Sequence, residues 1–434
     1  MPNSKKISFM AAVLMNINTI VGSGIYIYPQ FMAKQAGGLS FLSWVIAALL
    51  LLPIVLTIAQ AARIFPGEGG FYNYSKTALG EDAGFIANWA YLLGYMGIVA
   101  TITSVVRDRL IDPIGCTFVR TSPILFYILF ILIISLLNLI NIRLVSRIQS
   151  GITLLKLMPL LLMFGVIYFY WNPSFNYETN RICDLGSTLP LALFSFLGFG
   201  SACNISHYIE GGSTKASRVI LIAFSTSALL YTVFHLGMLH IMGSQPLAIY
   251  GIQASPRFMG FAASAASIIA LILLADMMLS FINTSYGAAL NNITSINILA
   301  KSKLVFLSRF LAKQNARGIP TNAALIHGIL IIALVVFIPS TKILTAITNL
   351  GICLAFLLTI VAVLVQSWRK KIYGSFLMAG ISFISMGALL FLTWTTTLGD
   401  NNLERFLHAT PILIGIPIGY LMFRWAKKKY QPIK

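Results

Sequence analysis

Long apolar stretches separated by short polar segments dominate the 434-residue chain. Twelve of them carry at most one charge and have about the 20 residues that a helix needs to cross a hydrocarbon core of about 30 Å. The pattern therefore predicts an all-α polytopic membrane protein, a single transmembrane domain over residues 1–434. Its twelve spans are predicted at residues 7–33, 35–62, 83–106, 121–142, 148–171, 185–209, 219–243, 258–282, 319–340, 343–368, 372–398 and 406–423.

Composition supports this class. Hydrophobic residues make up 58% of the chain and charged residues only 9%, whereas about a quarter of a soluble protein is charged. This deficit excludes a soluble globular enzyme, a disordered chain and a nucleic-acid binder with a basic face. The lipid bilayer and a small-molecule substrate are the expected partners, with no nucleic acid, and the chain is expected to be a monomer or homodimer. The four cysteines match no metal spacing, so no metal or other cofactor is expected.

The positive charges are distributed unevenly between the predicted loops. If the N-terminus lies inside, 21 of the 30 basic residues fall on the cytoplasmic side and 8 on the outer side, while Lys156 falls within a span. Cytoplasmic loops of membrane proteins carry such an excess. We therefore expect both termini in the cytoplasm, with the protein in a bacterial inner (plasma) membrane, and the net charge of +19 reflects topology.

Two predicted spans contain glycine-rich interruptions. Residues 18–25 read NTIVGSGI in span 1, and residues 194–202 read FSFLGFGSA in span 6. Glycine-interrupted spans at matching places in two halves point to a transporter binding site. We predict breaks at residues 21–24 and 198–201 that lie close in space. Alternatively, these small residues only allow close helix packing.

The matching interruptions divide the chain into two units of five helices. The first unit covers about residues 7–177 and the second about 185–368, which predicts a 5+5 inverted repeat. Two extra helices follow, at about 372–426.

The broken helices suit a zwitterionic substrate. Free N–H groups at Ser23, Gly24 and Ile25 would begin the outer half of span 1, where the helix dipole attracts a carboxylate. Carbonyl groups freed around residues 194–197 could accept hydrogen bonds from an ammonium group. We therefore predict a substrate with a free α-amino-carboxylate.

Several motifs resemble the amino acid–polyamine–organocation superfamily of transporters. They are GSGI at 22–25 followed by Pro29, FPGEGGFYNY at 65–74, the acidic-then-basic segment 210–218 and KQNARGIP at 313–320. The resemblance implies the leucine-transporter fold and alternating access for amino acids or related amines. With the breaks, it gives a predicted substrate site made of Thr19, Ile20, Gly22, Ser23, Gly24, Ile25, Tyr91, Phe194, Ser195, Leu197, Gly198 and Phe199.

Two charged residues lie within predicted spans and are candidate coupling residues. Lys156 resembles the span 5 lysine of sodium-independent branches, whose ammonium occupies the region of a sodium ion, and we expect it to reach carbonyls near Ile20 and Val21. The alternative is that Lys156 extends to the cytoplasmic interface. Asp276 is the only acid within a span. The depth of Asp276 in the membrane depends on the register of span 8. Counting back from the motif before span 9 places span 8 nearer residues 286–295, and Asp276 would then lie nearer the outer surface.

A secondary active transporter, permease or exchanger, is the leading functional hypothesis. A membrane-embedded enzyme is the first alternative, although one buried acid and one buried lysine do not form a catalytic pair. A transporter-like amino acid sensor is the second, although no soluble signalling domain is visible. A disulfide between Cys116 and Cys183, both in predicted outer loops, is a further possibility.

Overall fold

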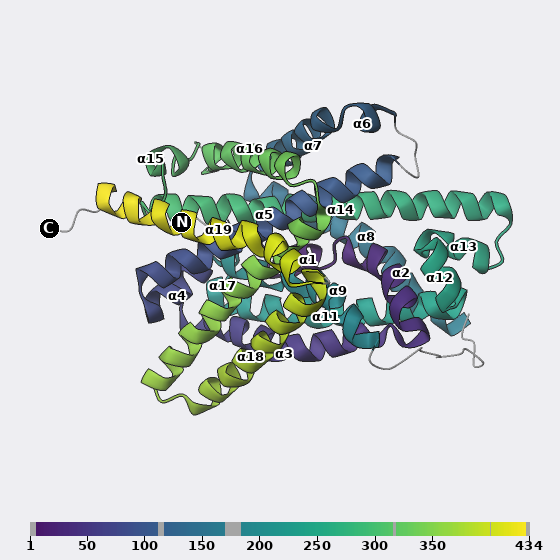
Figure 1. Cartoon of the computed structure of the whole chain (residues 1–434), viewed down its shortest axis with the longest axis horizontal. Helices are drawn as coiled ribbons and strands as arrows, with labels where there is room; N and C mark the ends of the chain where they lie inside the picture. The colour runs from purple at the N-terminus through teal and green to yellow at the C-terminus, as the bar shows by residue number, and fades with distance from the viewer. Residues whose placement is uncertain (1–5, 112–116, 170–183, 316–317, 400, 431–434) are drawn as a thin grey trace.

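The computed structural model describes residues 6–111, 117–169, 184–315, 318–399 and 401–430. Almost all of these residues are helical, and the helices pack side by side into one elongated bundle (Figure 1). A single β-bridge pairs Ile7 with Ile209 within the described residues. Cys116 and Cys183 lie outside them, whereas Cys203 and Cys353 are buried free thiols.

The helices of the first half follow one another along the chain in three groups. The N-terminal group is α1 (Phe9–Ile20), α2 (Gly24–Ala36), α3 (Leu42–Ile64) and α4 (Phe71–Leu79). The long α5 (Glu81–Ile111) is followed by α6 (Thr117–Thr121), α7 (Pro123–Leu137) and α8 (Ile142–Phe169). The sixth span comprises α9 (Asp184–Phe196), the 3-10 segment η3 (Leu197–Gly200) and α10 (Ser201–Asn204).

The second half continues with α11 (Gly212–Met242), α12 (Ser244–Tyr250), α13 (Ser255–Phe258), α14 (Ala263–Lys301) and α15 (Ser308–Leu311). It ends with α16 (Thr321–Phe337), α17 (Thr341–Arg369), α18 (Tyr373–Leu392) and α19 (Asn402–Tyr430). Further 3-10 turns cover Gly37–Leu39, Ser206–Tyr208 and Ile252–Ala254, and a π-helical turn covers Thr393–Thr397.

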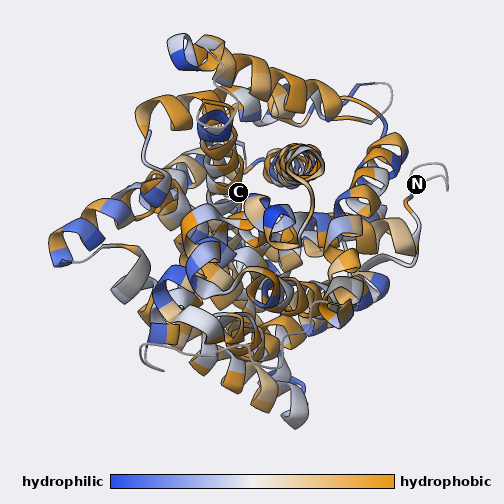
Figure 2. Ribbon diagram, turned by 90° about the vertical axis from the view of Figure 1, so that its right-hand side faces the viewer, coloured by the Kyte–Doolittle hydropathy of each residue, from blue (hydrophilic) through white to orange (hydrophobic). Residues whose placement is uncertain are grey.

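The helices are long and apolar enough for a polytopic membrane protein. Within the described residues, ten helical segments meet the length and hydropathy expected of a membrane span, and α7 and α16 are shorter apolar helices. In order, these twelve correspond to the twelve predicted spans. Hydrophobic residues run along the helices around the outside of the bundle (Figure 2), as expected where the neighbouring medium is lipid.

The prediction for the eighth span is wrong in its bounds. Instead of residues 258–282, α14 covers 39 residues from Ala263 to Lys301, so it includes both Asp276 and the alternative register. The polar residues that suggested a loop, among them Asn283, Asn291 and Ser295, are buried against neighbouring helices. They donate or accept hydrogen bonds there, which is why their polarity does not end the helix.

Basic residues of α15 and α19 gather at one end of the bundle. In Figure 1, α4, α15 and the C-terminal end of α19 lie at the left end, where the basic residues of α15 and α19 gather, while α12 and α13 lie at the right end. The interruptions of α1 and α9 lie between these two ends.

Candidate functional site

A narrow cavity of about 30 Å³ lies between the two interrupted spans. It is large enough for a water molecule. Span 1 contributes five of its lining residues and span 6 three, and the rest come from α5 and α14. The lining residues are Thr19, Ile20, Gly22, Ser23, Gly24, Ile98, Ile102, Phe194, Ser195, Gly198 and Thr284.

The interruption of span 1 lies where the sequence predicts it. The helix α1 ends at Ile20, Gly22 N–H donates to the Ile20 carbonyl at 2.9 Å, and α2 begins at Gly24. Among the described residues, the N–H groups of Ser23, Gly24 and Ile25 find no hydrogen-bond partner. Ser23 and Gly24 line the cavity, so the start of α2 presents unpaired donors at the cavity wall.

Lys156 reaches this interruption from α8. Its side chain is fully buried, and its ammonium donates to the Asn18 carbonyl at 3.2 Å, to Asn18 Oδ1 at 2.6 Å and to the Val21 carbonyl. The contact with Val21 is the predicted one, and the ammonium does not extend to the surface. The Ile20 carbonyl between these acceptors accepts from the Tyr231 hydroxyl at 2.7 Å.

The interruption of span 6 begins earlier than the predicted 198–201. The α-helix α9 ends at Phe196, and η3 carries the chain through Gly200 before α10 resumes. Asn16 of α1 bonds this segment, because its side-chain amide donates to the Phe199 carbonyl at 3.1 Å and accepts from Ala202 N–H at 3.2 Å. The polar side chain thus satisfies backbone groups that the interrupted helix leaves free.

The two interrupted spans touch each other closely. The Thr19 hydroxyl lies 3.2 Å from the Gly198 carbonyl and 2.8 Å from Ser201 Oγ. A Cβ atom on Gly198 would lie 2.1 Å from the Thr19 carbonyl oxygen, and one on Gly24 would lie 2.1 Å from Ser195 Oγ. Close packing therefore requires glycine at both positions, as the alternative explanation of these motifs expects. Both residues also line the cavity.

A third helix joins both interruptions. The Tyr231 hydroxyl of α11 lies within hydrogen-bond distance of two carbonyl oxygens, Ile20 at 2.7 Å and Ser195 at 3.2 Å. Because one phenol bridges the ends of α1 and α9, these two helices are held together at the cavity.

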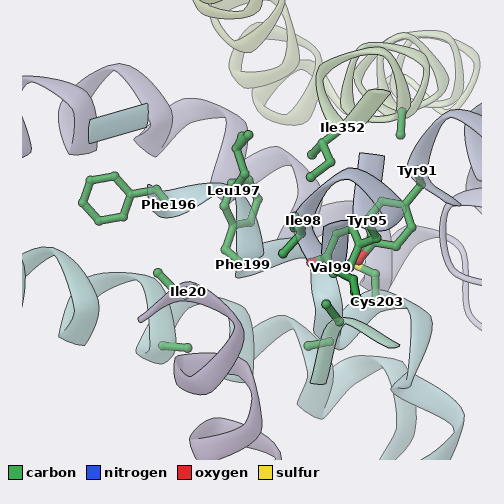
Figure 3. Packing of buried hydrophobic residues seen from close by; sticks show 14 of the residues in the cluster. Ile20, Tyr91, Tyr95, Ile98, Val99, Phe196, Leu197, Phe199, Cys203 and Ile352 are labelled. Atoms are coloured by element: carbon green, nitrogen blue, oxygen red, sulfur yellow. The ribbon is translucent and has the colours of Figure 1, made fainter. Parts of the chain in front are cut away.

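Four of the residues predicted to bind substrate do not line the cavity. Ile25 is completely buried and Leu197 is 4% exposed. The Tyr91 ring packs on Tyr95 with centroids 4.3 Å apart, and Phe199 stacks on Phe356 at 4.8 Å. Figure 3 shows this packed cluster beside the cavity residues Ile20 and Ile98.

Three lining residues were missed by sequence reasoning. Ile98 and Ile102 look like any other apolar residues of a span, so no sequence signal distinguishes them. Thr284 lay beyond the predicted end of span 8. Its hydroxyl donates to the Asn18 carbonyl at 3.1 Å, and a polar residue in an extended span 8 could have indicated this position.

Asp276 lies away from the cavity. It is 8% exposed, and Oδ2 accepts a hydrogen bond of 2.7 Å from the Tyr26 hydroxyl of α2. The same hydroxyl lies 3.4 Å from the backbone carbonyl of Lys156. Asp276 therefore connects α14 to α2 and does not line the cavity between the interrupted spans.

A wider vestibule of about 410 Å³ adjoins the cavity at Ser23. It extends along α5 to Asp108 and Arg109, toward the end of the bundle opposite the basic end. The rings of Tyr28, which lines the vestibule, and Phe194, which lines the cavity, meet edge to face with centroids 6.0 Å apart. This aromatic pair lies where the vestibule meets the cavity.

The described residues contain no group of three or more His, Cys, Asp or Glu side chains that could hold a metal ion.

Residues 7–420 match the family model described as amino acid permease. The chain belongs to the amino acid permease family. It is therefore an integral membrane protein of a transporter family, which removes the membrane-embedded enzyme as an alternative.

Curated relatives agree with this assignment. The permease chain is 24% identical over 259 residues to the large neutral amino acids transporter small subunit 2 of Homo sapiens, which covers 56% of this chain and 48% of that protein. It is 25% identical over 260 residues to the protein of the same name from Oryctolagus cuniculus, with 56% and 48% covered. The chain thus spans about half the length of the curated relatives it matches.

Proposed function

We propose that the chain is a secondary active transporter that carries neutral amino acids across the membrane by alternating access, as a permease or exchanger, without sodium. The observation that carries this proposal is the row of unpaired N–H groups at Ser23, Gly24 and Ile25 beside a cavity between two interrupted spans.

The carboxylate of the substrate would bind at these N–H groups. They begin α2, a helix of 13 residues, so the partial positive charge of its N-terminus adds to the hydrogen bonds. Ser23 also lines the vestibule, which gives an arriving carboxylate access to the same donors.

The ammonium and side chain of the substrate would face the remaining walls. The ammonium would lie near the end of α9, where Phe194 and Ser195 line the cavity and carbonyl groups approach the interruption. No Asp, Glu, Lys or Arg is among the described lining residues, and Ile20, Ile98 and Ile102 offer apolar contacts. This lining favours a neutral side chain, because a charged one would be desolvated without a partner. The large neutral amino acids transporters that the chain resembles are named for neutral amino acids as well.

Lys156 would take the place of a sodium ion. Its ammonium contacts two oxygens of Asn18 in α1 and the carbonyl of Val21, which follows α1. A single positive charge among oxygens meets the need that sodium meets in related folds. The lysine and the Tyr26–Asp276 pair would both act in coupling, because each joins α1 or α2 to α8 or α14.

Alternating access would use the paired interruptions. We assign repeat 1 to about residues 7–177, repeat 2 to about 185–368 and the extra helices to about 372–426, with both termini in the cytoplasm. The cavity of about 30 Å³ is too small for an amino acid, so its walls must move on binding. The Tyr28–Phe194 pair would close the vestibule side.

The test is competition in liposomes. Purified protein is reconstituted, and uptake of labelled leucine is measured against unlabelled leucine, arginine, glutamate and 3-methylbutylamine, the decarboxylated form of leucine. Leucine should compete, and the amine, arginine and glutamate should compete far less. Equal competition by leucine and its amine would contradict the carboxylate site, and absence of uptake for leucine, alanine and phenylalanine would contradict the function.

A further inference from the structure

A second, apolar cavity lies on the outer face of the bundle. It has a volume of about 320 Å³, and its lining residues come from α5, α14, α16 and α19 and from the segment that leads into α15. This volume is at the lower end of the range of roughly 300–1,000 Å³ for small-molecule sites. It shares no lining residue with the substrate cavity.

The walls of this outer cavity offer no hydrogen bond. All the lining side chains are hydrophobic, and the indole N–H of Trp89, the one N–H among them, already donates to the Gly415 carbonyl at 2.9 Å. A polar ligand would lose its hydration here without compensation. An acyl chain has no hydrogen bonds with water to lose.

The outer cavity opens at the surface of the bundle. Three of its lining residues are strongly exposed: Phe306 at 51%, Leu307 at 45% and Leu330 at 40%. Acyl chains of the bilayer can therefore enter without crossing water. Because lipid tails are as apolar as the protein side chains, the cavity alone would not select one lipid over another.

Selection would come from basic residues at its rim. Lys303 and Arg309 flank the exposed pair Phe306 and Leu307 in the sequence, and both are exposed. The ring of Trp425 lies 5.2 Å from that of Phe306, and the Lys429 ammonium lies 4.7 Å from the Trp425 ring. Two chain segments thus bring positive charge to the same rim.

These charges are not neutralised by the protein. Among the described residues, Lys303, Arg309 and Lys429 form no ion pair. By contrast, Lys427 and Arg424 of the same helix pair with Glu81 at 2.8 Å and Asp82 at 3.9 Å. Glu81 and Asp82 are therefore engaged by other basic residues, and the rim attracts an anion.

The backbone at the rim is strained. Lys303 and Leu307 adopt positive φ angles of 60° and 57°, which non-glycine residues rarely do. Such strain concentrates where a ligand contact or a switch requires it. Here it shapes the turn that carries Lys303 and the cavity residues Phe306 and Leu307.

We propose that an anionic phospholipid binds at this place, with one acyl chain in the outer cavity and its phosphate on Lys303, Arg309 and Lys429. Clusters of Lys and Arg next to membrane helices favour anionic headgroups. The bound lipid would also support α5, which carries Met96 in the outer cavity and Ile98 in the substrate cavity. The proposal does not rest on the transport function.

The experiment measures lipid binding directly. Delipidated full-length protein in detergent is titrated with phosphatidylglycerol, phosphatidylcholine of the same acyl chains, or inorganic phosphate, and bound lipid is counted by native mass spectrometry. Phosphatidylglycerol should bind at one tight site and raise the midpoint of thermal unfolding. Phosphatidylcholine should bind much more weakly, and inorganic phosphate should not raise the midpoint. Equal binding of the two lipids, or an equal effect of phosphate, would overturn the proposal.

Two variants with matched controls distinguish the contribution of the lipid headgroup from that of the acyl chain. The triple variant Lys303→Gln, Arg309→Gln, Lys429→Gln should weaken phosphatidylglycerol binding by about fivefold per charge, or roughly 100-fold in total. Removing three exposed charges elsewhere, by Arg147→Gln, Arg218→Gln and Lys370→Gln, should not.

Leu330→Trp should fill the cavity and block the site, whereas Leu325→Trp on another face of α16 should not. Each variant is compared with wild type by its cooperative unfolding transition, so that loss of binding is measured on folded protein. Wild-type affinity in either the triple variant or Leu330→Trp would contradict the proposed site.

Discussion

The ammonium group of Lys156 donates hydrogen bonds to both oxygens of Asn18, to the backbone carbonyl at 3.2 Å and to side-chain Oδ1 at 2.6 Å. With the Val21 carbonyl as third acceptor, all three protons of the ammonium are satisfied. A single buried side chain of α8 thus holds the last turn of α1 and the residue that follows it.

Replacing Lys156 by alanine should therefore weaken both the fold and transport. Asn18 Oδ1 and the Val21 carbonyl would lose their donor, and each buried unsatisfied group costs about 1–3 kcal/mol. We expect a lower midpoint of thermal unfolding in detergent for Lys156→Ala and a cooperative transition that remains. Lys34→Ala, at an exposed lysine of α2, is the control and should leave the midpoint unchanged. An unchanged midpoint in Lys156→Ala would contradict the role of these hydrogen bonds.

Gly198→Ala should disrupt the contact between the two interrupted spans. The new Cβ would lie 2.1 Å from the Thr19 carbonyl oxygen and 2.7 Å from Ile20 N. Overpacking costs typically about 1–3 kcal/mol, and here the neighbour is backbone that cannot rotate away. We expect loss of leucine uptake and a lower unfolding midpoint.

The matched control for this variant is Gly186→Ala, also in α9, where the added Cβ meets no atom within 4 Å. It should retain uptake, since alanine is the better helix former by about 1 kcal/mol. Equal behaviour of the two variants would show that the close approach at Gly198 does not matter.

The Tyr26–Asp276 hydrogen bond should contribute to stability. Tyr26→Phe keeps the ring and removes the hydroxyl that donates to Asp276 Oδ2 at 2.7 Å, which leaves a carboxyl only 8% exposed without this donor. A loss of about 1–3 kcal/mol is expected, seen as a lower unfolding midpoint. Tyr28→Phe on the same helix is the control, because its hydroxyl makes no hydrogen bond to the described residues. If both variants unfold at the wild-type midpoint, the bond is not stabilising.

The stability of the folded protein should fall in mild acid because of His207. This residue lies in the 3-10 turn Ser206–Tyr208, between α10 and α11. Burial lowers the pKa of His207 to about 4, with Glu68 acting in the opposite direction and Lys301 in the same one. The folded protein thus keeps this imidazole neutral, while the unfolded chain binds a proton below a pH of about 6.5. The stabilisation is complete above that pH and is lost as the pH falls toward 4, by up to roughly 3 kcal/mol. Unfolding midpoints at pH 7 and pH 5 should differ less in His207→Gln than in wild type. An identical pH dependence in both proteins would contradict this assignment.

Hydropathy and glycine spacing were sufficient to predict much of the fold. The order of the ten long and two shorter apolar helices follows from the apolar stretches, because a helix satisfies its own backbone hydrogen bonds in lipid. The interruption before Gly24 follows from the glycines. The cost of burying a charge marks Lys156 as a candidate functional residue, but its contact near Val21 was expected only from the family resemblance. The bounds of span 8 were predicted wrongly because Asn283 and Asn291 are polar, as loop residues are. The sequence alone does not show that they are buried.

The details of the site depend on packing that no local pattern encodes. Ile98 lines the cavity while Ile25 is buried behind it, although both are apolar residues in a span. Tyr91 packs on Tyr95 and Phe71 instead of facing the cavity, because the rotation of α5 is set by the helices around it. Such rotations depend on contacts between helices far apart in the sequence.

The most direct test of the account is uptake of labelled leucine by the purified protein in liposomes, in choline buffer without sodium. Wild type should transport at the same rate with choline as with sodium, because the Lys156 ammonium already supplies the positive charge at the first interruption. Lys156→Ala, reconstituted to the same density, should lose most of this uptake. A strict requirement for sodium in wild type, or full uptake by Lys156→Ala, would contradict the account.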